Sequence, residues 1–246
     1  MINHLSYHYP KNHKIIFDDL SINIMPKSIN VLLGENGEGK TTLFDVVSGL
    51  IRTDAQIHDK VPEKDLVYQI QGVPILSTLC GKDLAELILC SSGQYRFRDM
   101  NPYLFEKKLG YDKESFKKVR YLWKMQYGKM SPGERRWFTI LLYCFIDKTL
   151  YIFDEPTAGV DSYAARQIIE QINLLQEKEG KTIFIATHRI DDLRHFSHFY
   201  IHVLSHGKIV LNEDEQNWIQ AAKRVNLPFL NVFADAWIND TRKMIE

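Results

Sequence analysis

Short hydrophobic runs recur along the chain and predict the strands of a sheet. Residues 29–33 form a mainly apolar run that stops at Gly34, as a buried strand does where it enters a tight turn. Residues 20–24 alternate between apolar and polar side chains, which is typical of a half-buried strand. Residues 199–204 and 209–211 flank a polar segment and predict a hairpin. Runs rich in β-branched or aromatic residues predict further strands at 66–68, 150–153 and 182–186.

The spacing of hydrophobic residues changes between residues 83 and 146, where it predicts helices. No repeat, linker or low-complexity tract interrupts the chain, so we expect a single domain over residues 1–246. Strands that alternate with helices, together with a mainly helical middle, predict an α/β fold with a helical insertion. Basic residues gather in this middle part, and we interpret them as a solvated face: Lys107, Lys108, Lys117, Lys118 and Arg120.

The composition narrows the classes of function. The 31 basic residues balance the 31 acidic ones, which argues against a nucleic-acid partner because nucleic-acid binders usually carry a basic surplus. The 3 cysteines follow no metal-ligand spacing, so we expect reduced thiols. No apolar run approaches the roughly 20 residues that cross a bilayer, and the N-terminus has no signal-peptide pattern. We therefore expect a cytoplasmic protein that reaches a membrane only through a partner.

A glycine-rich segment, residues 34–42, fits the phosphate-loop pattern GxxxxGK[ST] between a strand and a predicted helix. Glycine lets several backbone N–H groups approach a triphosphate at once, and the helix that begins near Lys40 adds the positive end of its dipole. Lys40 supplies a charge to the β- and γ-phosphates, and the Thr41 hydroxyl is a ligand for Mg²⁺. The sequence therefore predicts a site for ATP and Mg²⁺ built from Gly34, Asn36, Gly37, Gly39, Lys40, Thr41 and Thr42.

The predicted strand at 150–153 ends in two carboxylates, Asp154 and Glu155. Asp154 can hold Mg²⁺ opposite Thr41, directly or through water. Glu155 is then placed to polarise the attacking water. An apolar run followed by two acids is a weak signal alone, but beside a phosphate loop it predicts the catalytic carboxylate.

Residues 131–134 form a capping box, with Ser131 as the N-cap, Pro132 in the first turn and Glu134 three residues after the serine. The free N–H groups at such a helix start can receive an anion. Considered alone, the segment is better interpreted as an ordinary capped helix. Together with Asp154 downstream, residues 131–135 resemble the signature of ABC ATPases, usually LSGGQ. Met130, Pro132 and Glu134 depart from that pattern, and Glu134 adds a carboxylate near a phosphate site.

The resemblance runs in family order from Tyr9 to about Glu213. It implies a P-loop NTPase (RecA-like) core with an antiparallel β subdomain and a helical signature subdomain. Residues 1–75 and 147–246 would form the core and the β subdomain, and residues 76–146 the helical subdomain.

The resemblance also assigns roles to single residues. Tyr9 would stack on adenine, although the neighbouring Tyr7 competes for that place. Residues 158–161 would cross a dimer interface. Ser131, Gly133 and Glu134 would border the ATP held by an opposite subunit. The catalytic residues would be Glu155, His188 and Gln71, with Gln69 a near neighbour of the last, and the metal ligands would be Thr41, Gln71 and Asp154.

The function implied is that of the ATP-hydrolysing motor subunit of an ABC transporter. It would pair head to tail with a second nucleotide-binding domain, as a homodimer or a heterodimer. From the cytoplasmic face of the membrane, it would drive a separate integral membrane permease. Export is favoured over import, because residues 212–246 are too short for the extra domain of some import ATPases. The alternatives are a soluble ABC ATPase that acts as an assembly scaffold, and a regulatory module without activity.

Two apolar segments remain after these assignments. The stretch from Gln71 to Leu84 is apolar enough to receive a helix of the permease, or else fills the core of the helical subdomain. Its apolar members are Val73, Ile75, Leu76, Leu79 and Leu84. The C-terminal segment is more apolar than a free tail, so we expect it to pack on the core.

Overall fold

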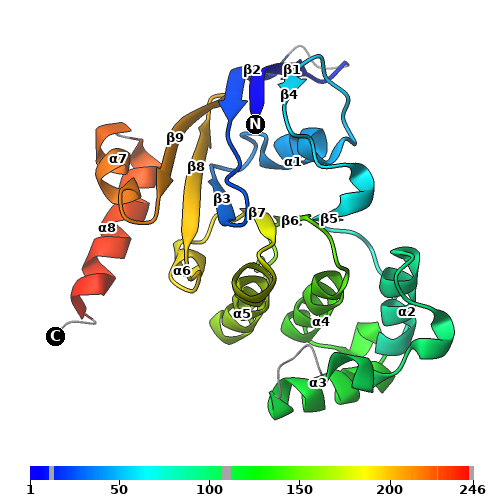
Figure 1. The fold of residues 1–246 in the computed structure, drawn as a ribbon. Helices are drawn as coiled ribbons and strands as arrows, with labels where there is room; N and C mark the ends of the chain where they lie inside the picture. Colours follow the sequence, from blue (N-terminus) through cyan, green and yellow to red (C-terminus); the bar gives the residue numbers. More distant parts are fainter. Residues whose placement is uncertain (11–13, 107–111, 226, 244–246) are drawn as a thin grey trace.

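The computed structural model describes residues 1–10, 14–106, 112–225 and 227–243, with side chains up to residue 238. A six-stranded sheet crosses the molecule and carries helices on both faces (Figure 1). Five of its strands run parallel, and the last pairs antiparallel with its neighbour. In spatial order the strands are β5 (Leu66–Gln69), β6 (Leu150–Asp154), β7 (Thr182–Ala186), β3 (Ile29–Leu33), β8 (Phe199–Ser205) and β9 (Lys208–Asp214).

Alternate residues of the central strands face two separate cores, as the two-residue period of a strand requires. Val31 of β3 packs in the core beneath α4 (Pro132–Phe145) and α5 (Ser162–Glu179). Its neighbour Leu32 packs in the other core, with Phe44 of α1 (Lys40–Ser48). Both faces are covered, which explains why the central strands read as almost continuous hydrophobic runs.

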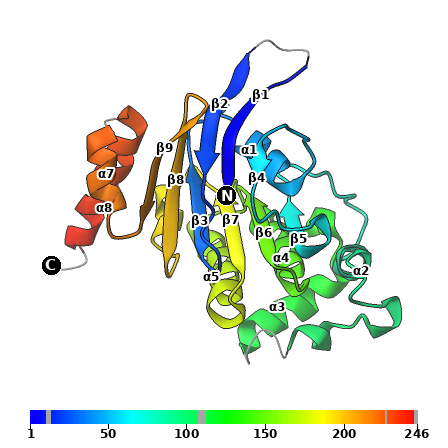
Figure 2. The same ribbon diagram turned by 45° about the horizontal axis from the view of Figure 1, so that its top comes forward.

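A second, three-stranded antiparallel sheet has the order β2-β1-β4, lies above α1 in Figure 1 and comes forward in Figure 2. The sequence did not predict β1 (Ile2–His8), and β2 (Ile15–Ile22) ends before the predicted end at residue 24. Beyond Ile22 the chain leaves the sheet, and the N–H of Met25 donates to the side chain of Asn30 at 2.7 Å. The third strand is the short β4 (Gln56–Ile57).

The predicted hairpin is present as β8 and β9. Its two turn residues, His206 and Gly207, have φ angles of 51° and 75°, the backbone that a two-residue hairpin turn needs. The middle of the chain is helical, as predicted, and contains α2 (Gly81–Ser91), α3 (Lys113–Lys124) and α4. Short 3₁₀ helices at Phe97–Asp99, Pro102–Phe105 and Tyr127–Lys129 connect these elements, and another, Glu63–Asp65, precedes β5. The boundary of a helical subdomain at residues 76–146 stays a prediction.

The C-terminal segment packs on the main core, as expected. It forms α7 (Trp218–Val225) and α8 (Pro228–Lys243), which lie beside β9 in Figures 1 and 2. Trp218 and Leu230 are fully buried, and the rings of Trp218 and Trp237 meet edge to face at 5.5 Å. None of the helices in the described ranges combines the length and the apolar content that crossing a bilayer demands.

Candidate active site

The predicted site residues follow the carboxyl ends of neighbouring parallel strands. The phosphate loop follows β3, Glu155 follows β6, His188 follows β7 and Gln71 follows β5. Because these strands are parallel, their carboxyl ends lie at one edge of the sheet. That edge is where α/β proteins bind their ligands.

The phosphate loop depends on glycine at three points. Gly37 and Gly39 have φ angles of 87° and 104°, in the left-handed region that residues with a Cβ avoid. At Gly34 a Cβ would lie only 2.7 Å from the carbonyl oxygen of Leu204, so the loop could not lie this close to β8. The resulting loop presents successive backbone N–H groups beside the start of α1, which is a cradle for an anion.

Lys40 is buried at 7% exposure, and its ammonium donates to the carbonyl oxygens of Gly34 and Glu35 at 2.8 and 3.1 Å. Burial lowers the pKa of Lys40, while the carboxylates of Glu155, Asp154 and Glu38 act in the opposite direction. The ammonium therefore lies within the loop itself, where it can exchange its carbonyl partners for phosphate oxygens.

Thr41 and Asp154 form a pair of oxygen ligands. The Thr41 hydroxyl donates to Oδ2 of Asp154 at 2.7 Å, and Asp154 is 1% exposed. Burial raises the pKa of Asp154, and the Thr41 hydrogen bond and the charge of Lys40 oppose that rise. A hydroxyl and a carboxylate held side by side next to a phosphate cradle fit Mg²⁺, which is bound by few protein oxygens together with phosphate.

Glu155 lies between Gln71 and His188. Its Oε2 accepts a hydrogen bond from Gln71 at 3.0 Å, and its Oε1 is 3.1 Å from Nδ1 of His188. Its φ angle of 48° is strained for a residue with a side chain, and such strain concentrates at functional sites. The Glu155 N–H donates to the carbonyl of Ala186, and this contact with the end of β7 holds the strained backbone. The structure thus brings the three predicted catalytic residues together.

Tyr9, the expected adenine-stacking residue, also reaches the phosphate loop. Its hydroxyl is 3.0 Å from the hydroxyl of Thr42, and its ring meets that of Tyr7 edge to face at 5.3 Å. Tyr9 is 39% exposed, so an aromatic side chain is accessible beside the nucleotide cradle.

The signature segment (residues 131–135) lies elsewhere on the surface. The predicted capping box is present: the Glu134 N–H donates to the Ser131 hydroxyl at 3.2 Å, and the Ser131 N–H donates to the Glu134 carboxylate at 2.8 Å. Gly133 lets α4 approach α5, because a Cβ there would lie 2.9 Å from that of Ala164. Ser131, Gly133 and Glu134 line a hollow that does not include the phosphate loop or His188.

The sequence did not reveal a buried network behind His188. Asp192 of the short helix α6 (Ile190–Leu193) is 1% exposed and accepts hydrogen bonds from the hydroxyls of Thr157 and Thr187. Burial raises the pKa of Asp192, while the two threonines and Arg189 act against that rise. Arg189 also donates to the carbonyls of Thr157 and Val160 at 3.1 and 3.0 Å. The network ties residues 157–160 to the segment that carries His188.

Comparisons with known proteins agree with this geometry. A family model for the ABC transporter matches residues 17–158, more than half of the chain. The chain belongs to the ABC transporter family. It is one of the ATP-binding cassettes of that family, and it is an ATPase. It is 31% identical over 228 residues to the protein McbF of Escherichia coli, covering 89% of this chain and 88% of that protein.

Two further relatives extend the comparison. The energy-coupling factor transporter ATP-binding protein EcfA2 of Ligilactobacillus salivarius is 26% identical over 264 residues, covering 94% of this chain and 86% of the relative. A solved ATP-binding subunit of an ABC transporter superimposes with a TM-score of 0.72 at 19% identity, covering 94% of this chain and 96% of that one. The expected fold class is confirmed: a P-loop NTPase core with an antiparallel β sheet and a helical part.

Proposed function

We propose that this ABC-family chain is the Mg²⁺-dependent motor subunit of a transporter, closing head to tail with a second nucleotide-binding domain and driving a separate membrane permease. It would work at the cytoplasmic face of the membrane. The observation that carries the proposal is the cluster of Glu155, Gln71 and His188 beside the pair of Thr41 and Asp154.

Each residue of the cluster has a role in hydrolysis. Lys40 and the loop N–H groups hold the β- and γ-phosphates, and Thr41 and Asp154 would hold Mg²⁺, which neutralises charge on the phosphates. Glu155 accepts the proton of the attacking water or orients that water, and Gln71 and His188 fix the direction of its carboxylate. His188 is in turn placed to contact the γ-phosphate. Hydrolysis is then achieved by positioning and by charge stabilisation.

The separation of the signature segment from the phosphate loop supports the head-to-tail arrangement. Both surfaces are open, and each carries half of a nucleotide site: one half holds the triphosphate, and the other offers the capped start of α4. A solved cassette at 18% identity, with a TM-score of 0.68, is described as a dimer in a post-hydrolysis state bound to ADP and Pi. In our proposal a second copy, or a related domain, supplies Ser131 and Gly133 across the interface.

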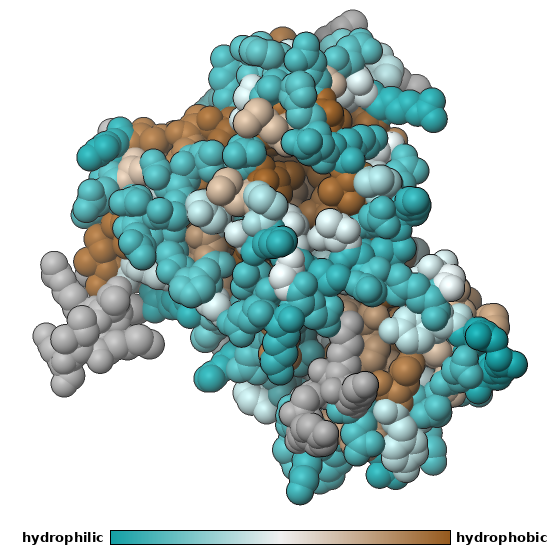
Figure 3. Space-filling model, viewed as in Figure 1, coloured by the Kyte–Doolittle hydropathy of each residue, from teal (hydrophilic) through white to brown (hydrophobic). Residues whose placement is uncertain are grey.

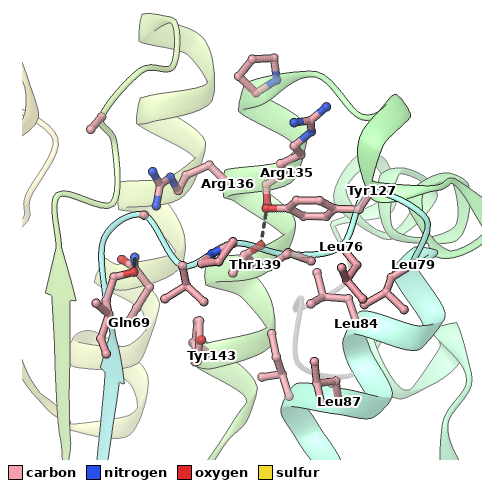
Figure 4. A pocket seen from close by; sticks show the side chains of 18 of the residues that line it. Gln69, Leu76, Leu79, Leu84, Leu87, Tyr127, Arg135, Arg136, Thr139 and Tyr143 are labelled. Carbon is pink, nitrogen blue, oxygen red and sulfur yellow. Dashed lines mark hydrogen bonds between the residues drawn. The ribbon is translucent and has the colours of Figure 1, made fainter.

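A groove beside Gln71 supports the permease partner. The segment after β5, helix α2 and helix α4 line a hollow of about 430 Å³, shown in Figure 4. Leu76 and Leu87 border it and are 70% and 60% exposed. Of the two alternatives left open for Leu84, core filling holds, because Leu84 is 1% exposed although it also borders this hollow. The face in Figure 3 is mainly hydrophilic, with hydrophobic residues in scattered patches. A groove bordered by exposed leucines suits the apolar face of an amphipathic helix.

The test is membrane recruitment. We expect the protein to sediment with membranes only when its permease is co-expressed, and Leu76→Asp to abolish that co-sedimentation while ATP affinity is unchanged. Leu50→Asp is the matched control, since Leu50 is 64% exposed but lies outside the groove. If the protein stays soluble in its native cells and crosslinking captures no membrane protein, the scaffold ATPase replaces the transporter motor. Export rather than import stays a prediction, tested by the direction of ATP-dependent transport in vesicles.

A further inference from the structure

The signature segment carries a charge that opposes its proposed task. Glu134 has the position of the usual glutamine, and its carboxylate stays at the helix start because it accepts the N–H of Ser131. The hollow next to it measures about 640 Å³ and is also lined by the carboxylates of Glu114 and Asp161. A triphosphate that approaches this surface from a second subunit meets three acidic groups. Without compensation, such like charges oppose association.

Lys118 projects into the same hollow and is held there by specific contacts. Its ammonium donates to Oε1 of Gln167 at 2.7 Å and lies 4.2 Å from the centre of the Trp137 ring. Gln167 donates in turn to the hydroxyl of Tyr163 at 3.2 Å. These contacts connect α3 to α4 and α5, so the ammonium is fixed where the helical part meets the core.

This position differs from that of the other cations in the basic cluster. Lys107 and Lys108 lie outside the described residues, and Arg120 is exposed. Lys117 borders the same hollow, but it is exposed to solvent, which screens its charge. Lys118 is half-buried. Burial lowers the pKa of Lys118, and the charges of Glu134 and Asp161 act against that effect. The ammonium therefore lies near both carboxylates. The interpretation as a solvated face therefore does not extend to Lys118.

We propose that Lys118 is a positioning residue of the signature surface, whose ammonium compensates the carboxylate of Glu134 so that the triphosphate held by a second subunit can dock there. The inference rests on the proposed head-to-tail dimer. It explains how a signature with glutamate in place of glutamine remains compatible with an anionic ligand. Lys118 acts on the nucleotide through the charge of Glu134 and the geometry of the helix start.

The experiment measures ATP-driven dimerisation by light scattering, in a Glu155→Gln background that prevents turnover. Lys118→Met keeps the hydrocarbon stem against Trp137 and removes the charge. We expect it to raise the ATP concentration for half-maximal dimerisation about tenfold, the size of a lost close charge pair at an interface. Lys124→Met, an exposed lysine of the same helix with the same change in net charge, is the control and should leave that concentration within about twofold.

Charge rescue separates compensation from a merely structural role. In the double variant Lys118→Met/Glu134→Gln the ATP requirement should return to within about threefold of the parent, because the carboxylate that needed compensation is gone. Lys118→Arg should also retain dimerisation. If Lys118→Met matches Lys124→Met, or if Glu134→Gln gives no rescue, the inference is wrong while the proposed function stands. If the Glu155→Gln parent itself stays monomeric with ATP and Mg²⁺, the closed dimer is wrong and the inference is overturned with it.

Discussion

The edge of the sheet and the signature surface are built differently. At the sheet edge, Glu155, Asp154 and Lys40 are nearly or fully buried, and each has partners that the chain itself provides. At the signature surface, Ser131 is exposed, Glu134 is half-buried, and their only mutual contacts are those of a helix cap.

The difference separates two tasks. A buried cluster with fixed partners keeps its geometry between turnovers and costs little reorganisation when the reaction occurs. An open helix start depends on whatever approaches it, so its local charge decides how readily a nucleotide-loaded partner docks. Substitutions at the sheet edge should therefore act on chemistry and binding within one chain, and substitutions at the signature surface on association.

The largest effect is expected at Glu155. In Glu155→Gln the amide oxygen can still accept the hydrogen bond from Gln71, but the side chain can no longer accept a proton from water. Steady-state hydrolysis should therefore fall about a thousandfold, while ATP affinity is retained. A coupled-enzyme assay for released phosphate measures the rate. Glu170→Gln, an exposed glutamate of α5, is the control. A loss smaller than about tenfold would assign the catalytic carboxylate to another residue.

Lys40 follows in size. Lys40→Ala removes the buried cation beside the cradle, and ATP affinity should fall about a hundredfold, or roughly 3 kcal/mol. Isothermal titration calorimetry gives the dissociation constant, and circular dichroism checks that the fold survives. Lys208→Ala, an exposed lysine of β9, should bind ATP normally. Unchanged ATP binding in a folded Lys40→Ala protein would refute the nucleotide site.

Much of the sheet edge could be predicted from sequence because its chemistry is local. The phosphate loop fits a fixed spacing, and Asp154 and Glu155 lie at the end of a hydrophobic strand. The residues that carry the function are therefore the same residues that make the sequence pattern. The hairpin of β8 and β9 is also local in sequence. The first strand escaped prediction because two consecutive polar residues, Asn3 and His4, interrupt the hydrophobic alternation where the pairing with β2 shifts register between Ile2 and Leu5.

The contacts that depend on distant segments could not be predicted. Asp192 meets Thr157 across 35 positions of sequence, and Lys118 meets Gln167 across 49. The residue types carry no signal at those spacings, because aspartate, threonine and lysine are common on exposed helices. Only the burial of Asp192 and the half-burial of Lys118 distinguish them from a solvated surface.

The network around Arg189 tests whether the two regions communicate. Arg189→Met removes two hydrogen bonds to the carbonyls of Thr157 and Val160 and the ion pair with Asp192. Residues 157–160 should then move independently of His188, lowering kcat about tenfold while the dissociation constant of ATP changes less than about threefold. Arg166→Met, which breaks an exposed pair with Glu170, is the control. Equal losses in ATP affinity and kcat would show that the network only supports the fold of the binding site.

The smallest effect is expected at Glu134, and it sharpens the comparison most. Glu134→Gln retains an acceptor for the Ser131 N–H, so the capping box weakens only by about 0.5 kcal/mol, while a negative charge leaves the surface that would face a second nucleotide. Hydrolysis should be equal or up to about threefold faster, and dimerisation should need less ATP. Rates measured at two salt concentrations provide the check, because the gain should shrink as salt screens the removed repulsion. A fall of tenfold or more, about 1.4 kcal/mol of transition-state stabilisation, would mean that the Glu134 carboxylate itself takes part in catalysis. The signature surface would then contribute to the chemical step, as the sheet edge does, and not only to association.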